Sequence, residues 1–261
     1  MPPSSSAACP DPGVPGPQVP LDPHVPETRF GKWFLRTETW SVHVLDRAIE
    51  DLCRLIPHRL PDYPVVVDVG CGAGRSLPKL QACFAPRRLV GVDIDPAMIS
   101  LCRSQFDTLA EQPELVLGSS ARLPLPDASV DLVFCHQTFH HLVEQEAALH
   151  DFMRVLRPGG IMLFAESTRR YIASWPIMLL FRHPMQVQRT APEYLQMVRA
   201  AGFDVPAAAV SHPYLWWSRP DLGALERFFG RQPRQGREET LINLVATKPA
   251  AAVARAISTG A

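Results

Sequence analysis

The sequence predicts an α/β fold in which a seven-stranded, mostly parallel sheet carries helices on both faces. Short β-branched or apolar runs bounded by turn residues recur along the chain, beginning with residues 65–69. Segments with apolar residues at helical spacing alternate with several of these runs. The first run leads directly into a glycine-rich turn and a helix, an order typical of parallel sheets whose strands are buried on both faces.

The composition is that of a globular protein of moderate size. The chain has 261 residues, 46% of them hydrophobic, which is enough to bury a full core. Its 26 basic and 26 acidic residues balance, so no overall field favours nucleic acid or an anionic membrane. No apolar stretch is long enough to predict a transmembrane helix. The six cysteines contain no C-x-x-C pair, which disfavours a zinc site and a disulfide framework and suits a reducing, cytoplasmic location.

Three parts are expected along the chain. Residues 1–28 contain nine of the 27 prolines and few large apolar side chains, which predicts a disordered tail. The same segment lacks the basic start and apolar core of a secretory signal. Residues 29–248 are expected to form one domain, and the alanine-rich residues 249–261 a frayed tail.

A glycine-rich turn follows the strand predicted at residues 65–69. Its three glycines, which let the backbone approach a ligand closely, are Gly70, Gly72 and Gly74. The spacing excludes both a dinucleotide-binding loop and a P-loop, because each requires glycine where Arg75 stands. Asp68 would repel a pyrophosphate and favours a cationic ligand. A turn that binds nothing is the alternative from this stretch alone.

This D-x-G-x-G-x-G pattern resembles the class I S-adenosylmethionine-dependent methyltransferases, in particular the small-molecule, type 11-like group. The resemblance continues in order over residues 65–166, through G-S-S-A-R-L-P at 118–124 and L-R-P-G-G at 156–160. It implies a Rossmann-like fold with S-adenosylmethionine as the cofactor. It also implies that the N-terminal segment covers the site, with Trp33 and Trp40 as candidate lid residues, although ordinary packing explains both tryptophans equally well.

The resemblance also assigns the cofactor contacts. Asp93, at the end of the strand predicted at 88–94, would accept hydrogen bonds from both ribose hydroxyls. Ser119 stands where the family has an aspartate against adenine and would accept a weaker bond because it is uncharged. The expected cofactor-binding residues are Asp68, Gly70, Gly72, Gly74, Asp93, Ile94, Ser119, Ser120 and Ala121.

Three histidines follow the strand predicted at residues 130–135. Ligands bind beyond the carboxyl ends of parallel strands, and an imidazole can remove a proton near neutral pH. His136 and His140 are therefore the candidate catalytic bases, whereas His141 is expected to be structural at the start of the next helix. No metal is expected, because no carboxylate partner stands at ligand spacing.

Beyond residue 166 the family pattern ends, and substrate choice is expected to lie there. The predicted elements are an apolar segment at 172–181, a helix at 192–201, a sixth strand at 203–210, an aromatic segment at 214–217, a helix at 220–229 and an antiparallel edge strand at 241–246. The apolar and the aromatic segments are candidates for the walls of a pocket.

The sequence therefore predicts methyl transfer to a small, apolar or aromatic acceptor, with no nucleic-acid partner. Two alternatives stay open. One is a methyltransferase that acts on a macromolecule, tRNA or protein, which a clustered basic surface would support. The other is a domain that binds the cofactor without transferring methyl. The sequence indicates neither the acceptor atom nor the oligomeric state.

Overall fold

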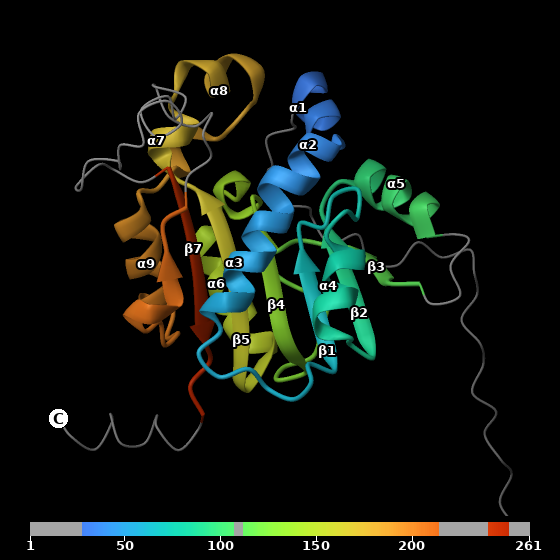
Figure 1. Cartoon of the computed structure of the whole chain (residues 1–261), viewed down its shortest axis with the longest axis vertical. Coiled ribbons are helices and arrows are strands. Elements are labelled where there is room, and N and C mark those ends of the chain that lie inside the picture. Colours follow the sequence, from blue (N-terminus) through green and yellow to red (C-terminus); the bar gives the residue numbers. More distant parts are fainter. Residues whose placement is uncertain (1–27, 107–111, 214–239, 251–261) are drawn as a thin grey trace, which may run out of the picture.

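The central element is a seven-stranded sheet with the order β3-β2-β1-β4-β5-β7-β6. It is seen in a computed structural model that describes residues 28–106, 112–213 and 240–250 (Figure 1). The strands are β1 (Val65–Val69), β2 (Arg88–Asp93), β3 (Glu114–Leu117), β4 (Val130–His136), β5 (Leu156–Ser167), β6 (Val210–Ser211) and β7 (Leu241–Thr247). Strands β1 to β5 run parallel, and β7 pairs antiparallel with both β5 and β6. The predicted fold class is confirmed.

Helices cover both faces of this sheet. They are α1 (Arg29–Phe34), α2 (Glu38–Trp40), α3 (Arg47–Leu55), α4 (Leu77–Phe84), α5 (Pro96–Phe106), α6 (Gln145–Val155), α7 (Arg169–Ile172), α8 (Trp175–Leu180) and α9 (Ala191–Ala200). A π-helical segment, Ser41–Asp46, joins α2 to α3. Residues of α3, α4 and α5 share one buried apolar cluster with one sheet face, and residues of α6 and α9 share a second cluster with the other.

The apolar character of the strands explains this two-sided core. Side chains alternate between the faces of a strand, so Val66 packs into one cluster and its neighbour Val67 into the other, both fully buried. All seven residues of β4 are buried as well. A strand with water on neither face needs apolar residues at almost every position, which is the pattern in the sequence.

Three expectations about the strands are wrong. The sixth strand, expected over 203–210, is only Val210–Ser211, because Pro206 has no N–H for a ladder and Ala207–Ala209 form a 3₁₀ turn. Strand β7 is not at the edge, since β6 pairs outside it. The L-R-P-G-G segment lies within β5 instead of forming a turn before it, and the register against β4 shifts there.

Several expectations fall outside the described residues. The aromatic segment 214–217 and the helix at 220–229 lie there, as do residues 1–27 and 251–261 of the predicted tails. The domain boundaries therefore stay predictions. Within the described parts, the five cysteines are free thiols. No described helix combines the length and the apolar character that a membrane crossing needs.

Candidate active site

A cavity of about 250 Å³ opens at the carboxyl ends of β1, β2 and β4. The predicted site residues that line it are Asp68, Gly70, Gly72, Asp93, Ile94, Ser120, Ala121 and His136. The topology explains this convergence, because β1 has β2 on one side and β4 on the other. Gly74, Ser119 and His140 are not among the described residues of its wall.

The glycine turn is held in backbone conformations that other residues rarely adopt. Gly70, Gly72 and Gly74 have φ angles of 77°, 53° and 82°. A Cβ atom at Gly70 would overlap the side chain of Thr138, and one at Gly74 would overlap the Cys102 sulfur, whereas one at Gly72 would meet nothing within 4 Å. Gly70 and Gly74 are thus required by packing, and Gly72 leaves its space to the cavity.

This difference predicts separable effects for two alanine substitutions. Gly70→Ala combines a strained φ with overpacking against Thr138 and should lower the free energy of unfolding by about 2–4 kcal/mol. Gly72→Ala carries only the strained φ and should cost about 1–2 kcal/mol. Urea unfolding of both variants measures the effects. Equal losses would contradict the assigned contact between residue 70 and Thr138.

Asp93 joins the end of β2 to the glycine turn. One carboxylate oxygen accepts from the Gly72 N–H at 2.8 Å, and the other accepts from the Asp95 N–H at 2.8 Å. Burial raises the pKa of Asp93, and these amide bonds oppose the shift. A carboxylate has about four lone-pair positions, so Asp93 can hold the turn and still accept from a ligand in the cavity.

Asp68 is the most buried acid in the cavity wall. Its carboxylate accepts a hydrogen bond from the Ser76 hydroxyl. Burial raises the pKa of Asp68 to about 7, with a further upward contribution from Asp93, while Ser76 acts in the opposite direction. A cationic group placed in the cavity would favour the ionised form. The sequence motif predicted the acid but not this shift, which depends on the depth of burial.

Of the two serines expected to contact the cofactor after β3, Ser120 lines the cavity and Ser119 does not. Ser119 is buried, and its hydroxyl accepts from the Ala121 N–H at 3.0 Å, so it shapes the loop. Its neighbours Ser120 and Ala121 line the cavity. The contact with adenine predicted for Ser119 stays a prediction.

His136 lies at the end of β4 and contacts two aromatic side chains. Its ring centroid is 5.5 Å from that of Trp40 and 5.9 Å from that of Phe134. Its Nε2 is buried and finds no hydrogen-bond partner among the described residues. Burial, with a smaller effect from His140, lowers the pKa of His136 to about 3. The catalytic role expected for His136 stays a prediction.

Glu166, at the end of β5, organises the turn that carries the other histidines. One carboxylate oxygen accepts from the backbone N–H groups of Thr138 at 2.8 Å and Phe139 at 2.7 Å. The other lies 2.6 Å from Nδ1 of His140, and both side chains are buried. The sequence analysis missed this role, because only the pairing of β4 with β5 brings Glu166 to the turn.

A second cavity, of about 70 Å³, adjoins the first. The two share the wall residues Leu35, Trp40, Gln137 and His141. The second cavity is otherwise mostly apolar, with Phe34, Val44, Tyr171, Ile172, Ile177 and Phe181 around His140 and His183. Part of this wall comes from α7 and α8, inside the segment expected to form a pocket.

The N-terminal segment contributes Lys32, Leu35, Arg36 and Trp40 to the wall of the first cavity. Lys32 Nζ lies 3.1 Å from Asp95 Oδ2, and Arg75 Nη1 lies 3.1 Å from Glu38 Oε1. Trp40 lines both cavities, whereas the side chain of Trp33 is 59% exposed and lines neither. Of the two candidate lid residues, only Trp40 lies where a lid would contact a ligand.

Comparison with known proteins identifies the domain. Residues 67–164 match a family model described as a methyltransferase domain. A malonyl-[acyl-carrier protein] O-methyltransferase of Methylococcus capsulatus is 31% identical over 62% of this chain and 60% of that protein. A fatty-acid O-methyltransferase of Mycolicibacterium smegmatis is 31% identical over 54% of this chain and 47% of that protein. The chain spans about half the length of the relatives it matches.

Solved structures share the fold. An S-adenosylmethionine-dependent methyltransferase from Aquifex aeolicus aligns with a TM-score of 0.59 at 18% identity, over 83% of this chain and 96% of that one. The [4+2]-cyclase SpnF aligns with a TM-score of 0.57 at 20% identity, over 78% and 81%. The fold thus admits more than one chemistry. Residues 67–164 therefore carry a methyltransferase domain, and the strand order and the acid-bounded glycine turn agree with the fold of the class I S-adenosylmethionine-dependent methyltransferases.

Proposed function

We propose that the chain binds S-adenosylmethionine in the larger cavity and transfers its methyl group to a small, apolar or aromatic acceptor in the smaller one. The observation that carries this proposal is the pair of adjoining cavities, which share Trp40 and His141. The first has acids and a glycine turn in its wall, and the second is mainly apolar. Methyl transfer needs the methyl donor and the acceptor atom in line, and two adjoining cavities allow this arrangement.

The residues of the larger cavity suit this cofactor. Asp93 retains lone pairs for the two ribose hydroxyls while it holds Gly72 and Asp95. The carboxylate of Asp68 complements a ligand that carries an ammonium and a sulfonium. Ser120 and Ala121 stand where the adenine edge is expected. The buried acids would repel a pyrophosphate, so they argue against a dinucleotide in the same cavity.

The bound cofactor would supply an electrophilic methyl group on a positively charged sulfur. In the transfer, an acceptor lone pair forms the new bond to the methyl carbon, and the electron pair of the broken carbon–sulfur bond stays on sulfur. The protein has to orient the two partners and exclude water. Trp40 and the segment that carries it close the cavity, and Glu166 fixes the turn that presents His140 and His141.

The choice of acceptor rests on the smaller cavity. Its aromatic and aliphatic wall favours an apolar group, and its volume of about 70 Å³ favours a small one or the reactive end of a longer one. Two relatives are named as O-methyltransferases of a fatty acid and of a malonyl carrier protein. Both names are consistent with an acceptor that has a carboxyl oxygen at the end of an acyl chain. Such compounds are among the first acceptors to test.

The decisive experiment is calorimetric titration of the purified chain with S-adenosylmethionine and S-adenosylhomocysteine. Micromolar binding of both, followed by formation of S-adenosylhomocysteine with fatty acids or phenols, is the expected result. A folded chain that binds neither compound would refute the proposal. Binding without transfer to any acceptor would favour the non-catalytic alternative.

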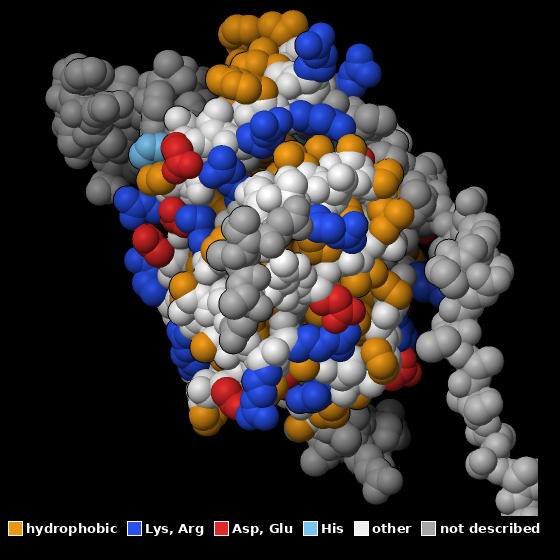
Figure 2. All heavy atoms as spheres, turned by 90° about the vertical axis from the view of Figure 1, so that its right-hand side faces the viewer, with side chains coloured by type: hydrophobic (Ala, Val, Ile, Leu, Met, Phe, Trp, Pro, Cys, Tyr) orange, Lys and Arg blue, Asp and Glu red, His pale blue; other side chains and the backbone are white. Residues whose placement is uncertain are grey.

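A macromolecular acceptor is the other alternative to be tested. Figure 2 shows basic side chains gathered beneath an apolar cluster at the top of one face, with acidic side chains scattered over the rest of it. Binding of tRNA through phosphates favours a continuous basic surface. Methyl transfer to bulk tRNA or to protein, with no transfer to small acceptors, would support this alternative over the proposal.

The raised pKa of Asp68 predicts a pH dependence of cofactor binding. With a pKa of about 7, this carboxyl is partly protonated at neutral pH and becomes negative as the pH rises. Affinity for the cationic cofactor should therefore increase between pH 6 and pH 8, with release of a proton on binding. Calorimetry in two buffers of different ionisation enthalpy detects that proton. An Asp68→Asn variant that released it equally would contradict the assignment.

A further inference from the structure

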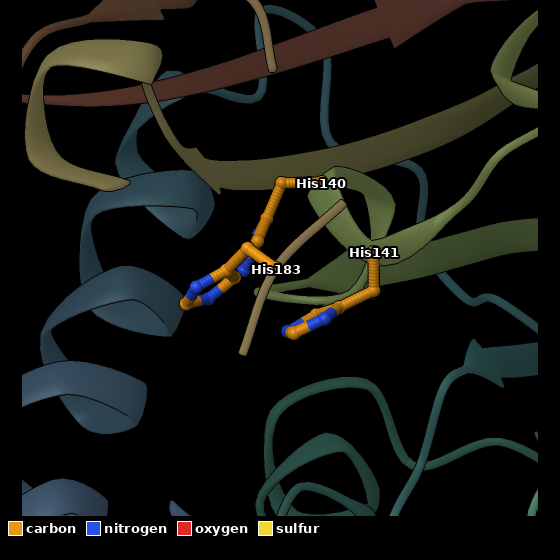
Figure 3. Close-up of side chains that lie close together, drawn as sticks. All are labelled: His140, His141 and His183. Atoms are coloured by element: carbon orange, nitrogen blue, oxygen red, sulfur yellow. The ribbon is translucent and has the colours of Figure 1, made fainter. Parts of the chain in front are cut away.

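We infer that His140, His141 and His183 form a site for a divalent ion of the zinc class. The ligand atoms of the three side chains all lie within 4.8 Å of one another. Figure 3 shows the rings gathered in one place, two from the turn after β4 and the third from the loop after α8. Imidazole nitrogen suits Zn²⁺ and other late first-row metals, and three histidines with an open position form a known type of catalytic zinc site.

The arrangement of Glu166 and His140 supports this assignment. The Glu166 carboxylate lies 2.6 Å from Nδ1 of His140, so Nδ1 is engaged by the carboxylate and Nε2 is the atom left to bind a metal. Histidines that ligate metals almost always donate their second nitrogen to a carboxylate or carbonyl in this way. Glu166 thus supplies a carboxylate that orients the proposed metal ligand His140. The spacing in the sequence did not reveal this carboxylate.

The rings of His141 and His183 can each offer a nitrogen lone pair to a metal ion. Neither His141 nor His183 has a hydrogen bond from its ring to another described residue; their contacts there are with other rings. A neutral imidazole has one nitrogen with a free lone pair, so His141 and His183 can each offer a ligand atom without breaking a hydrogen bond to a described residue.

An ion requires a small contraction of the cluster. With zinc–nitrogen bonds of about 2.0–2.1 Å, tetrahedral ligand nitrogens lie about 3.3 Å apart, so the rings must move together by up to about 1.5 Å. Ring rotation and the irregular backbone around His183 allow this adjustment, since residues 181–184 lie in neither helix nor strand. Glu166 anchors His140, so the other two rings are the ones that move.

All three histidines line the smaller cavity, which assigns the ion a role toward the acceptor. This role rests on the proposed function. In the open fourth position an acceptor hydroxyl or thiol would bind through its heteroatom and lose its proton to solvent. A lone pair of that heteroatom would then form the bond to the methyl carbon, while the carbon–sulfur bond of the cofactor breaks and its electron pair remains on sulfur.

Cobalt(II) is a spectroscopic probe for this site. The untagged chain, freed of metal with a chelator, is titrated with CoCl₂. We expect one cobalt per chain with the intense visible absorption of a four-coordinate ion. His183→Ala should weaken binding about 100-fold or more, because it removes one of three ligands. His183→Cys should retain binding and add thiolate-to-cobalt charge-transfer absorption, which places residue 183 on the ion.

The controls separate this inference from the proposed function. His150→Ala removes an exposed imidazole elsewhere and should leave cobalt binding unchanged. His183 is absent from the described wall of the larger cavity, so His183→Ala should still bind S-adenosylhomocysteine. Failure of the wild-type chain to bind cobalt, or equal binding by His183→Ala, would overturn the metal site. Failure to bind the cofactor would refute the proposed function and leave the metal site standing.

Discussion

Asp93→Ala is expected to weaken the binding of S-adenosylmethionine by about 100-fold or more. The carboxylate would accept from two ribose hydroxyls, and hydrogen bonds to a charged group contribute about 1.5–3 kcal/mol each. Losing two such bonds costs about 3–6 kcal/mol, which exceeds a hundredfold change in the dissociation constant. The substitution also leaves the Gly72 and Asp95 N–H groups without their carboxylate partner. Calorimetric titration measures the loss.

The effect should be equal for S-adenosylmethionine and S-adenosylhomocysteine, because both contain the ribose. A larger loss for the sulfonium compound would instead place Asp93 against the positive charge. Asp95→Ala is the matched control, since that neighbouring acid also lines the cavity but its carboxylate pairs with Lys32 at the rim. It should cost less than about tenfold, as expected for a partly exposed ion pair. Thermal melting of each free variant shows whether the fold has changed.

Glu166→Ala should lower the free energy of unfolding by about 3–5 kcal/mol. The substitution removes a fully buried carboxylate and leaves the N–H groups of Thr138 and Phe139 and the ring of His140 without their acceptor. Removal of one member of a buried, hydrogen-bonded charge network has a cost of this size. Denaturant unfolding measures the change.

Glu166→Gln provides a sharper version of this experiment. Its carbonyl oxygen can still accept from Thr138 and Phe139, so the expected loss is smaller than for alanine. Glu50→Ala is the matched control, because Glu50 forms an exposed pair with Arg47 three residues away in α3 and should contribute less than about 1 kcal/mol. Similar losses at residues 50 and 166 would show that Glu166 does not hold the turn.

The sequence predicted well what depends on local pattern. The valine-rich run at β1 and the short run at β2 identified strands, and the acids Asp68 and Asp93 were found because they stand at fixed places near the ends of those strands. Their convergence on one cavity follows from parallel pairing alone. The pairing is a consequence of apolar residues on both faces, which the sequence displays directly.

The remaining features depend on contacts between distant parts of the chain. In the sequence, Glu166 is simply the last residue of a predicted apolar strand. Only the register of that strand beside β4 shows that Glu166 accepts hydrogen bonds from the turn at 138–140. His183 lies in a segment without a family pattern, so nothing in the sequence associates it with His140. The apolar run near 203–210 suggested a strand, but Pro206 ends the ladder there. A hydrophobic pattern alone does not show whether strand formation or its interruption by a proline prevails.

Two ion pairs link the N-terminal segment to the wall of the larger cavity, and we expect them to affect how long a ligand stays. Lys32–Asp95 and Arg75–Glu38 are both partly exposed, so each is worth at most about 1 kcal/mol. Together they favour the covered form over the open one by roughly 30-fold at most. Their contribution to the barrier for product exit is therefore small, and salt lowers it further. If product release limits the proposed methyl transfer, turnover should be faster at moderate ionic strength than in dilute buffer.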